Sequence, residues 1–243
     1  MQPRFVGRLG LADAVTVANA IVGFLAIAVA TVDVDLAARL ILLAAVADGL
    51  DGVVARRMGG TSVGPYLDSL ADVSSFAIAP AVLVVVLLRD ATAPPALEPI
   101  FGLLILGIPA LFVAMAIVRL GFYTAHDVED TTTIGVQTTL AATILATTVL
   151  VGRGTPIVLL GATAAFAYLM VSSIAYPDLL ARDALLMGVV HVLAVAMPTF
   201  YGRVFPYALL SLALAYLILA PWFYWGEAER SLRASGAVKG KRS

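Results

Sequence analysis

The stretch ADGLDGVVARRMGGTSVGPYLDSLAD, residues 47–72, places several acidic residues within strongly apolar sequence. Its aspartates are Asp48, Asp51, Asp68 and Asp72. The first two are three residues apart and the last two are four apart, so in helices each pair lies on one face. The connector between the pairs is short and rich in glycine, which allows the two helices to run antiparallel. We therefore expect the four carboxylates to converge between two neighbouring helices.

The composition is that of a membrane protein. Of the 243 residues, 61% are hydrophobic and 13% are charged, and the mean hydropathy is +1.00. An ordinary soluble domain has about 25% charged residues. The net charge of −1 offers no basic surface for a nucleic acid. Because the chain has no cysteine, it has no disulfide framework and no thiolate metal site.

Apolar segments of about 20 residues can cross the hydrocarbon core as helices. They predict an all-α, polytopic membrane helix bundle of about eight transmembrane helices, with one membrane domain, 1–225, and a basic tail, 226–243. The first segment follows a basic start but has no small-residue cleavage site, which favours a retained helix. The expected spans are 11–32, 36–57, 69–88, 98–119, 134–151, 155–173, 183–199 and 206–225.

The basic residues predict the orientation, because Lys and Arg concentrate in cytoplasmic loops. With the N-terminus inside, eleven of the fifteen Lys and Arg residues fall on the cytoplasmic side and four on the other. This places both termini in the cytoplasm. The connector between the second and third spans, with its aspartate pairs, then faces the cytoplasm too.

The free-energy cost of placing these aspartates in a membrane must be compensated by other interactions. Each costs about 2.5–3.5 kcal/mol at the centre of a span, and mutual repulsion adds to this unless cations bind or some acids stay protonated. Oxygen ligands without His or Cys favour Mg²⁺, Mn²⁺ or Ca²⁺ over zinc. Two such ions about 4 Å apart can clamp a phosphoryl group. A structural role in ion pairs explains any one aspartate, but not all four at this spacing.

Small residues between the acids allow a large ligand to approach the helix backbones, and Arg56 can pair with its phosphates. These small residues are Gly49, Gly52, Ala55, Gly59, Gly60 and Gly64. Elsewhere, the HDVED run at 126–130 is interpreted as a solvated loop rather than a second metal site. His191 is interpreted as a residue that forms a hydrogen bond between helices.

The run D-G-L-D-G-V-V-A-R followed by G-P-Y-L-D-S-L-A-D resembles the signature of the CDP-alcohol phosphatidyltransferases, D-x-x-D-G-x-x-A-R and G-x-x-x-D-x-x-x-D. Seven residues separate Arg56 from Gly64, one fewer than is usual in that family. The segment LDSLADVSSFAIAPAVL resembles the phosphatidylserine and archaetidylserine synthase branch. The opening ADAVTVANAIVGFLAI is also similar to that branch, with Ala12 and Asp13 in place of Pro and Asn. The run VRLGFYTA retains Arg119 but lacks a second arginine typical of the branch.

The resemblance implies a catalytic membrane domain with a six-helix core at about 11–173 and extra helices at 183–225. It also implies a homodimer, a site that faces the cytoplasm, and two divalent cations, Mg²⁺ or Mn²⁺, with Ca²⁺ possible in a crystal. By this resemblance Asp48, Asp51, Asp68 and Asp72 are metal ligands, and Asp72 is also the general base. Arg56 is the second catalytic residue, which assists in neutralising the diphosphate. The resemblance assigns the nucleotide of the CDP-linked lipid to Thr16, Asn19, Gly52, Ala55, Arg56 and Gly64.

The implied reaction is attack of an alcohol on the lipid-bearing phosphorus of a CDP-linked diacyl- or dialkylglycerol, with release of CMP. The branch favours L-serine as acceptor, with Arg119 and Ser74 or Ser75 as its candidate contacts. A composition rich in Ala, Val and Asp but poor in Lys favours an archaeal ether lipid. Glycerol phosphate or inositol phosphate is an alternative acceptor. A cation transporter with an intramembrane carboxylate site is an alternative from another class.

Overall fold

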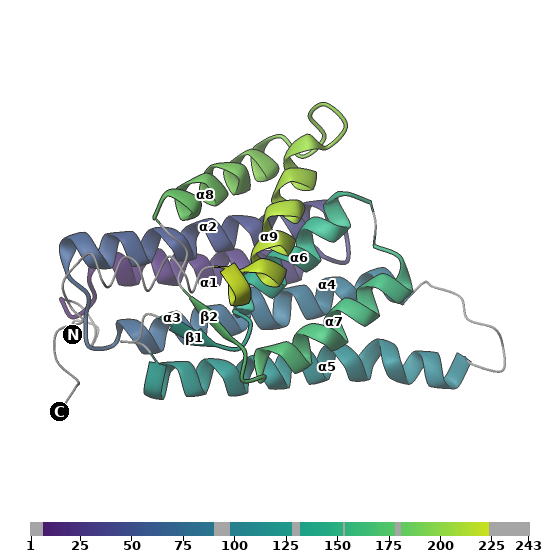
Figure 1. The fold of residues 1–243 in the computed structure, drawn as a ribbon, viewed down its shortest axis with the longest axis horizontal. Coiled ribbons are helices and arrows are strands. Elements are labelled where there is room, and N and C mark those ends of the chain that lie inside the picture. Colours follow the sequence, from purple (N-terminus) through teal and green to yellow (C-terminus); the bar gives the residue numbers. More distant parts are fainter. Residues whose placement is uncertain (1–6, 90–97, 128–131, 153, 178–180, 224–243) are drawn as a thin grey trace, which may run out of the picture.

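The computed structural model describes residues 7–89, 98–127, 132–152, 154–177 and 181–223. Within these ranges the protein is a helix bundle, as the sequence predicts, and its longest helices run along the long axis (Figure 1). Two π-helical segments, η1 and η2, continue α3 and α5, so the described elements form eight helical rods. The elements are α1 (Leu11–Val29), α2 (Val34–Met58), α3 (Gly64–Asp72), η1 (Val73–Ile78), α4 (Ala79–Leu88), α5 (Glu98–Phe122), η2 (Tyr123–Asp127), β1 (Thr132–Ile134), α6 (Thr138–Leu150), α7 (Pro156–Met170), β2 (Ala175–Pro177), α8 (Ala181–Ala196) and α9 (Val204–Phe223).

Four helical segments of the described chain are long and apolar enough to cross a membrane: Leu11–Val29, Gly64–Leu88, Pro99–Ala125 and Phe200–Pro221. Three shorter apolar helices lie in α6, α7 and α8. The 25-residue α2 has the length to span, but six charged residues interrupt its apolar sequence. Together with the composition, these helices identify a membrane protein.

The third rod begins at Gly64, five residues before the predicted start at 69. Pro65 stands in its first turn, where a missing backbone N–H has no cost and the fixed φ favours a helix. As a result Asp68 lies within the rod, one turn before Asp72.

Directly after Asp72 the backbone changes from α-helix to the π-helix η1. Such wide turns are rare and often occur at functional sites. Here α1 passes very close to the segment, because a Cβ atom placed on Gly23 would lie only 2.8 Å from the Cα atom of Ser75. The close approach of α1 therefore depends on glycine at position 23.

Helix α6 lies at the centre of the bundle. Twelve of its thirteen residues are buried, and it contacts α2, α7 and α9. The remaining residue, Thr139, is half-buried and faces Asp48. The middle of the bundle is thus packed solidly, with one side chain of this helix turned toward the acidic residues.

Two short strands were not predicted from the sequence. β1 and β2 pair antiparallel, with Thr133 opposite Tyr176, and they tie the connection before α6 to the connection after α7. Gly135 follows β1 with φ of 76°, and its N–H donates to the carbonyl of Ile174 at 2.7 Å. The predicted span 134–151 therefore begins later, at Thr138, because the chain first completes this ribbon.

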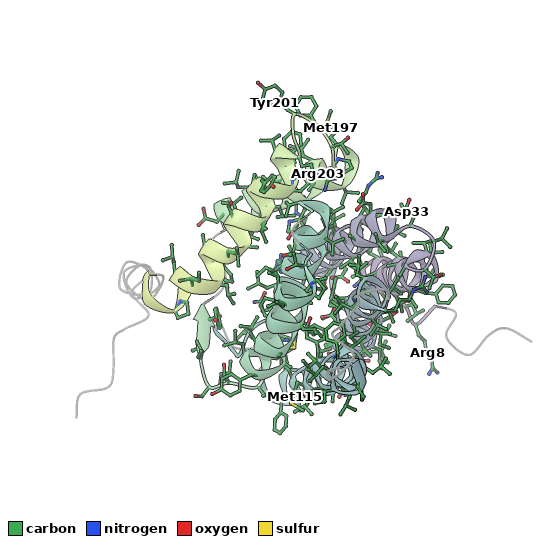
Figure 2. The ribbon with its side chains drawn as sticks, turned by 90° about the vertical axis from the view of Figure 1, so that its right-hand side faces the viewer. Arg8, Asp33, Met115, Met197, Tyr201 and Arg203 are labelled. Carbon is green, nitrogen blue, oxygen red and sulfur yellow. The ribbon has the colours of Figure 1, made fainter. Side chains whose placement is uncertain are left out.

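Helices α8 and α9 pack against α2 and α6. Arg39 of α2 donates from Nε to the carbonyl of Val195, near the end of α8, at 2.8 Å. The turn between α8 and α9 projects from the bundle with Met197 and Tyr201 at its tip (Figure 2). Residues 128–130 of the HDVED run and the predicted basic tail lie outside the described residues.

Candidate active site

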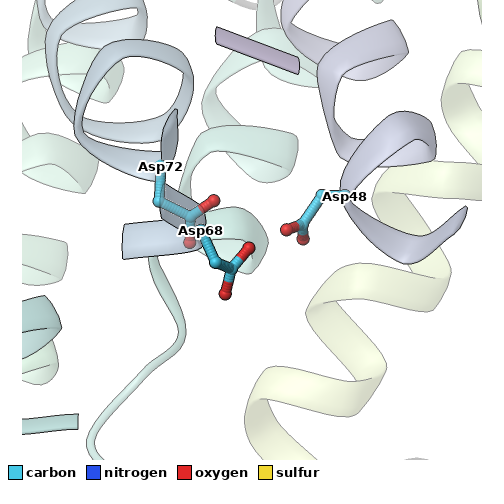
Figure 3. Close-up of side chains that lie close together, drawn as sticks. All are labelled: Asp48, Asp68 and Asp72. Atoms are coloured by element: carbon cyan, nitrogen blue, oxygen red, sulfur yellow. The ribbon is translucent and has the colours of Figure 1, made fainter. Parts of the chain in front are cut away.

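Three of the four aspartates meet in space. Asp48 comes from α2, and Asp68 and Asp72 come from α3. One carboxylate oxygen from each lies within 4.8 Å of those of the other two. Figure 3 shows the three side chains directed toward a common space between the two helices. The short connector thus brings the two acidic faces together.

Asp51 lies at the edge of this group and is held by α1. Its Oδ2 accepts a hydrogen bond of 2.6 Å from Oγ1 of Thr16, which also donates to the carbonyl of Ala12 at 3.1 Å. Asp51 and Thr16 are both buried. The first helix therefore orients the fourth carboxylate beside the other three.

The three clustered acids have few partners in the described protein. Thr139 of α6 donates to Oδ2 of Asp48 at 3.4 Å. Asp72 is only 8% exposed, and its Oδ1 has no hydrogen-bond partner among the described residues. A buried acceptor left unpaired costs about 1–3 kcal/mol, and more when it is charged.

This donor set fits a hard divalent cation. All the converging atoms are carboxylate oxygens, and they are close enough to share an ion. Asp72 also has a buried oxygen without a hydrogen-bond partner among the described residues. Mg²⁺ and Mn²⁺ favour such oxygen ligands. Asp48, Asp68 and Asp72 would hold the ion, with Asp51 beside them.

A cavity of about 250 Å³ adjoins the acids. Thr16, Gly52, Ala55 and Gly64 line it together with Asp51 and Asp68, so four residues assigned to the nucleotide share one space. Arg56 is exposed, and a Cβ atom on Gly52 would lie 3.4 Å from its Nη1, so the guanidinium lies over this glycine.

Asn19, also assigned to the nucleotide, is fully buried and is not among the residues that line the cavity. Neither atom of its side-chain amide has a hydrogen-bond partner among the described residues.

The candidate acceptor contacts lie farther along the same elements. Ser75 is buried and donates from Oγ to the backbone carbonyl of Asn19 at 3.0 Å, while Ser74 is half-buried. Arg119 is 8% exposed, and its guanidinium lies 5.6 Å from the ring centre of Tyr123, which lines the cavity. The hydrogen bond of Ser75 thus connects η1 to α1. Arg119 lies next to the cavity, because it contacts the ring of Tyr123.

Several residues at the site were not identified from the sequence. Asp13 and Thr61 line the cavity, Thr139 contacts Asp48, and Tyr123 closes one side. The only signal was that Asp13 and Tyr123 lie within runs that resemble the synthase branch. His191 behaves as interpreted, since its Nε2 lies 3.3 Å from Oγ1 of Thr143 on a neighbouring helix.

The fold and the site together define an α-helical membrane protein with a carboxylate cluster beside a cavity. The family model for CDP-alcohol phosphatidyltransferase matches residues 9–196. The chain belongs to the CDP-alcohol phosphatidyltransferase family. The match extends past the expected six-helix core at about 11–173 and includes α8.

The chain is also similar to a protein of Methanothermobacter thermautotrophicus named archaetidylserine synthase. The two are 31% identical over 174 residues, which covers 70% of each chain. The aspartate cluster lies within the part that the family model matches.

Proposed function

We propose that the protein transfers a phosphatidyl or archaetidyl group from a CDP-linked lipid to the hydroxyl of L-serine, with release of CMP. The observation that carries this proposal is the convergence of Asp48, Asp68 and Asp72 beside a cavity lined by small residues. A single membrane domain over 1–225, acting as a homodimer, would perform the reaction.

The cavity would hold the nucleotide of the donor. Gly52, Ala55 and Gly64 leave room for it against the helix backbones, and Arg56 can reach its phosphates from the rim. The carboxylates would hold two divalent cations, Mg²⁺ or Mn²⁺, which when bound neutralise the charge of the diphosphate. Thr16 keeps Asp51 turned toward the same space through its hydrogen bond.

Asp72 is suited to act as the general base. Its carboxylate is buried, one of its oxygens has no hydrogen-bond partner among the described residues, and one lies within 4.8 Å of carboxylate oxygens of Asp48 and Asp68. In the transfer, the serine hydroxyl gives its proton to Asp72 while its oxygen forms a bond to the lipid-bearing phosphorus. The bond from that phosphorus to the CMP oxygen breaks, and CMP leaves with the bonding electrons. Positioning of the two substrates contributes much of the rate.

Serine is the proposed acceptor because the similar archaeal protein is named archaetidylserine synthase. Arg119 would contact the serine carboxylate, and Ser74 or Ser75 would provide a polar contact. An archaeal ether lipid is the favoured donor, for the same reason and because of the composition. The proposed orientation has both termini and the site on the cytoplasmic side of the cell membrane, as the basic residues indicate.

An acceptor screen tests this proposal. The purified full chain in liposomes is given a CDP-linked lipid and Mn²⁺ or Mg²⁺, and CMP release is measured with L-serine, glycerol phosphate or inositol phosphate. We expect serine to support release and the two phosphates to give little. Equal turnover with a phosphorylated alcohol would mean that serine is not the specific acceptor. No CMP release with any alcohol, combined with cation flux, would favour the transporter.

A further inference from the structure

The carboxylate of Asp13 joins two segments that are far apart in sequence. Asp13 lies in the first turn of α1 and is 2% exposed. Its Oδ2 accepts the backbone N–H of Gly10 at 2.7 Å. Thr61 donates from Oγ1 to both carboxylate oxygens, at 2.9 Å and 3.1 Å. The first turn of α1 is therefore bonded to the connector between α2 and α3.

Thr61 is the point where that connector is fixed. Thr61 is half-buried, whereas the other residues of 56–63 are exposed. Gly59, two residues earlier, has φ of 88° and nothing within 4 Å of an added Cβ atom. A glycine-containing, exposed connector loses much conformational freedom when it is ordered. The hydrogen bonds to Asp13 hold it in one arrangement before any ligand binds.

This contact also forms part of the cavity wall. Asp13, Thr61 and Gly64 line the same cavity as Thr16 and Asp51. A Cβ atom on Gly64 would lie 3.3 Å from Oδ1 of Asp13, so the carboxylate packs closely between the connector and the start of α3. Moving the connector would therefore move the wall that faces Thr16.

We propose that Asp13 and Thr61 are a positioning pair, which fixes the connector as one wall of the cavity for the nucleotide of the donor. The inference rests on the proposed function, since it assumes that the cavity takes the CDP-linked lipid. In the described part of the chain, the hydrogen bonds of the pair join Asp13, Thr61 and Gly10 and do not involve the three clustered aspartates. Loss of the pair should therefore weaken donor binding and leave the chemical step intact.

The test compares two substitutions at one position. Thr61→Val removes the hydroxyl and keeps the shape, whereas Thr61→Ser keeps the hydroxyl. For Thr61→Val we expect the KM for the CDP-linked lipid to rise about tenfold, because a hydrogen bond to a carboxylate is lost. The kcat and the KM for the acceptor should stay within about twofold, and Thr61→Ser should resemble the native protein. Ser62→Ala is the matched control, since Ser62 is an exposed neighbour in the same connector.

A double-mutant cycle tests whether the two residues act together. Asp13→Ala removes the acceptor, and Asp13→Asn keeps one oxygen that can accept from both Gly10 and Thr61. We expect Asp13→Asn to keep a donor KM near the native value. We expect Thr61→Val to add little to the KM increase of Asp13→Ala. Additive increases, or a fall in kcat without a change in donor KM, would overturn the proposal.

Direct binding separates failure of this inference from failure of the proposed function. Thermal stabilisation of the full chain in detergent by the CDP-linked lipid and Mn²⁺ is measured without acceptor. Stabilisation of the native chain that is weaker in Thr61→Val supports the pair. Equal stabilisation in both would overturn the pair alone. No stabilisation of the native chain would overturn the assignment of the donor, and the inference with it.

Discussion

Buried polar side chains behave differently at the acidic site and in the helices that follow it. In α7, Thr163 donates to the carbonyl of Leu159 in its own helix. In α1, Thr16 makes the equivalent bond to Ala12, but it also reaches across to Asp51. At the acidic site, Asp72 of α3 has an oxygen without a hydrogen-bond partner among the described residues.

This difference distinguishes buried polar groups that only stabilise the fold from those that are available to a ligand. Buried polar groups in native proteins are normally paired, so an unpaired one requires an explanation. In the second half of α6, Thr147 and Thr148 are satisfied by their own helix, as membrane threonines commonly are. The unpaired carboxylate oxygen of Asp72 lies instead on α3, beside the other acids, where a bound ligand could pair with it.

The largest expected effect is at the unpaired oxygen. Asp72→Asn keeps the size of the side chain but removes the base, so CMP release should fall about 10²–10⁴-fold. Thr148→Val, which removes a buried hydroxyl that bonds only within α6, is the control and should retain activity. Activity of Asp72→Asn within tenfold of the native rate would contradict its assignment as the base.

Next in size is the close packing of α1 against η1. Gly23→Ala places a methyl group 2.8 Å from the Cα atom of Ser75, so the helices must separate. Overpacking of this kind costs about 1–3 kcal/mol, and thermal unfolding in detergent should show a lower Tm. Gly107→Ala is the control, because nothing lies within 4 Å of the added Cβ atom. If both variants unfold at the Tm of the native protein, α1 and η1 are not in close contact at this position.

Thr16 and Thr163 provide a matched pair of variants. Thr16→Val removes a hydrogen bond to Asp51 as well as one within α1, and kcat/KM should fall about tenfold, the usual effect of a bond to a charged group. Thr163→Val removes only the bond within α7 and should change kcat/KM less than twofold. The same loss in both variants would mean that the bond to Asp51 has no special role.

The smallest effect is expected at the far end of the bundle. Tyr207 of α9 donates from its hydroxyl to the carbonyl of Val151, after the end of α6, at 3.4 Å. Tyr207→Phe should lower the stability by about 0.5–1 kcal/mol and leave CMP release unchanged. A loss of activity without a loss of stability would show that α9 acts on the site directly.

The helices and the aspartate cluster were predictable because they depend on local rules. Hydropathy marks apolar helices, and spacings of three and four place side chains on one face. The position of Asp68 and Asp72 on one rod with Asp48 opposite follows from these rules and a short connector. Family resemblance added the roles that we propose for these residues, which spacing alone does not provide.

The remaining features depend on contacts between distant segments. The bond from Thr61 to Asp13 crosses 48 residues, and neither residue type is unusual where it stands. β1 and β2 have three residues each, too few for a periodic pattern, and they are stable only as a pair. Asn19 is buried and does not line the cavity. Its position depends on how α1 packs against the other helices, which the sequence of α1 alone does not specify.

The wide helical turn after Asp72 has a consequence for the spacing of the chain. Each residue added to or removed from an α-helix rotates everything beyond it by about 100°. If one residue were deleted within Val73–Ile78, either the carboxylates of α3 or the apolar face of α4 would turn away from its neighbours. The length of this segment therefore sets the rotation of the acidic half of the rod relative to its apolar half, so a substitution there should be tolerated more readily than a deletion.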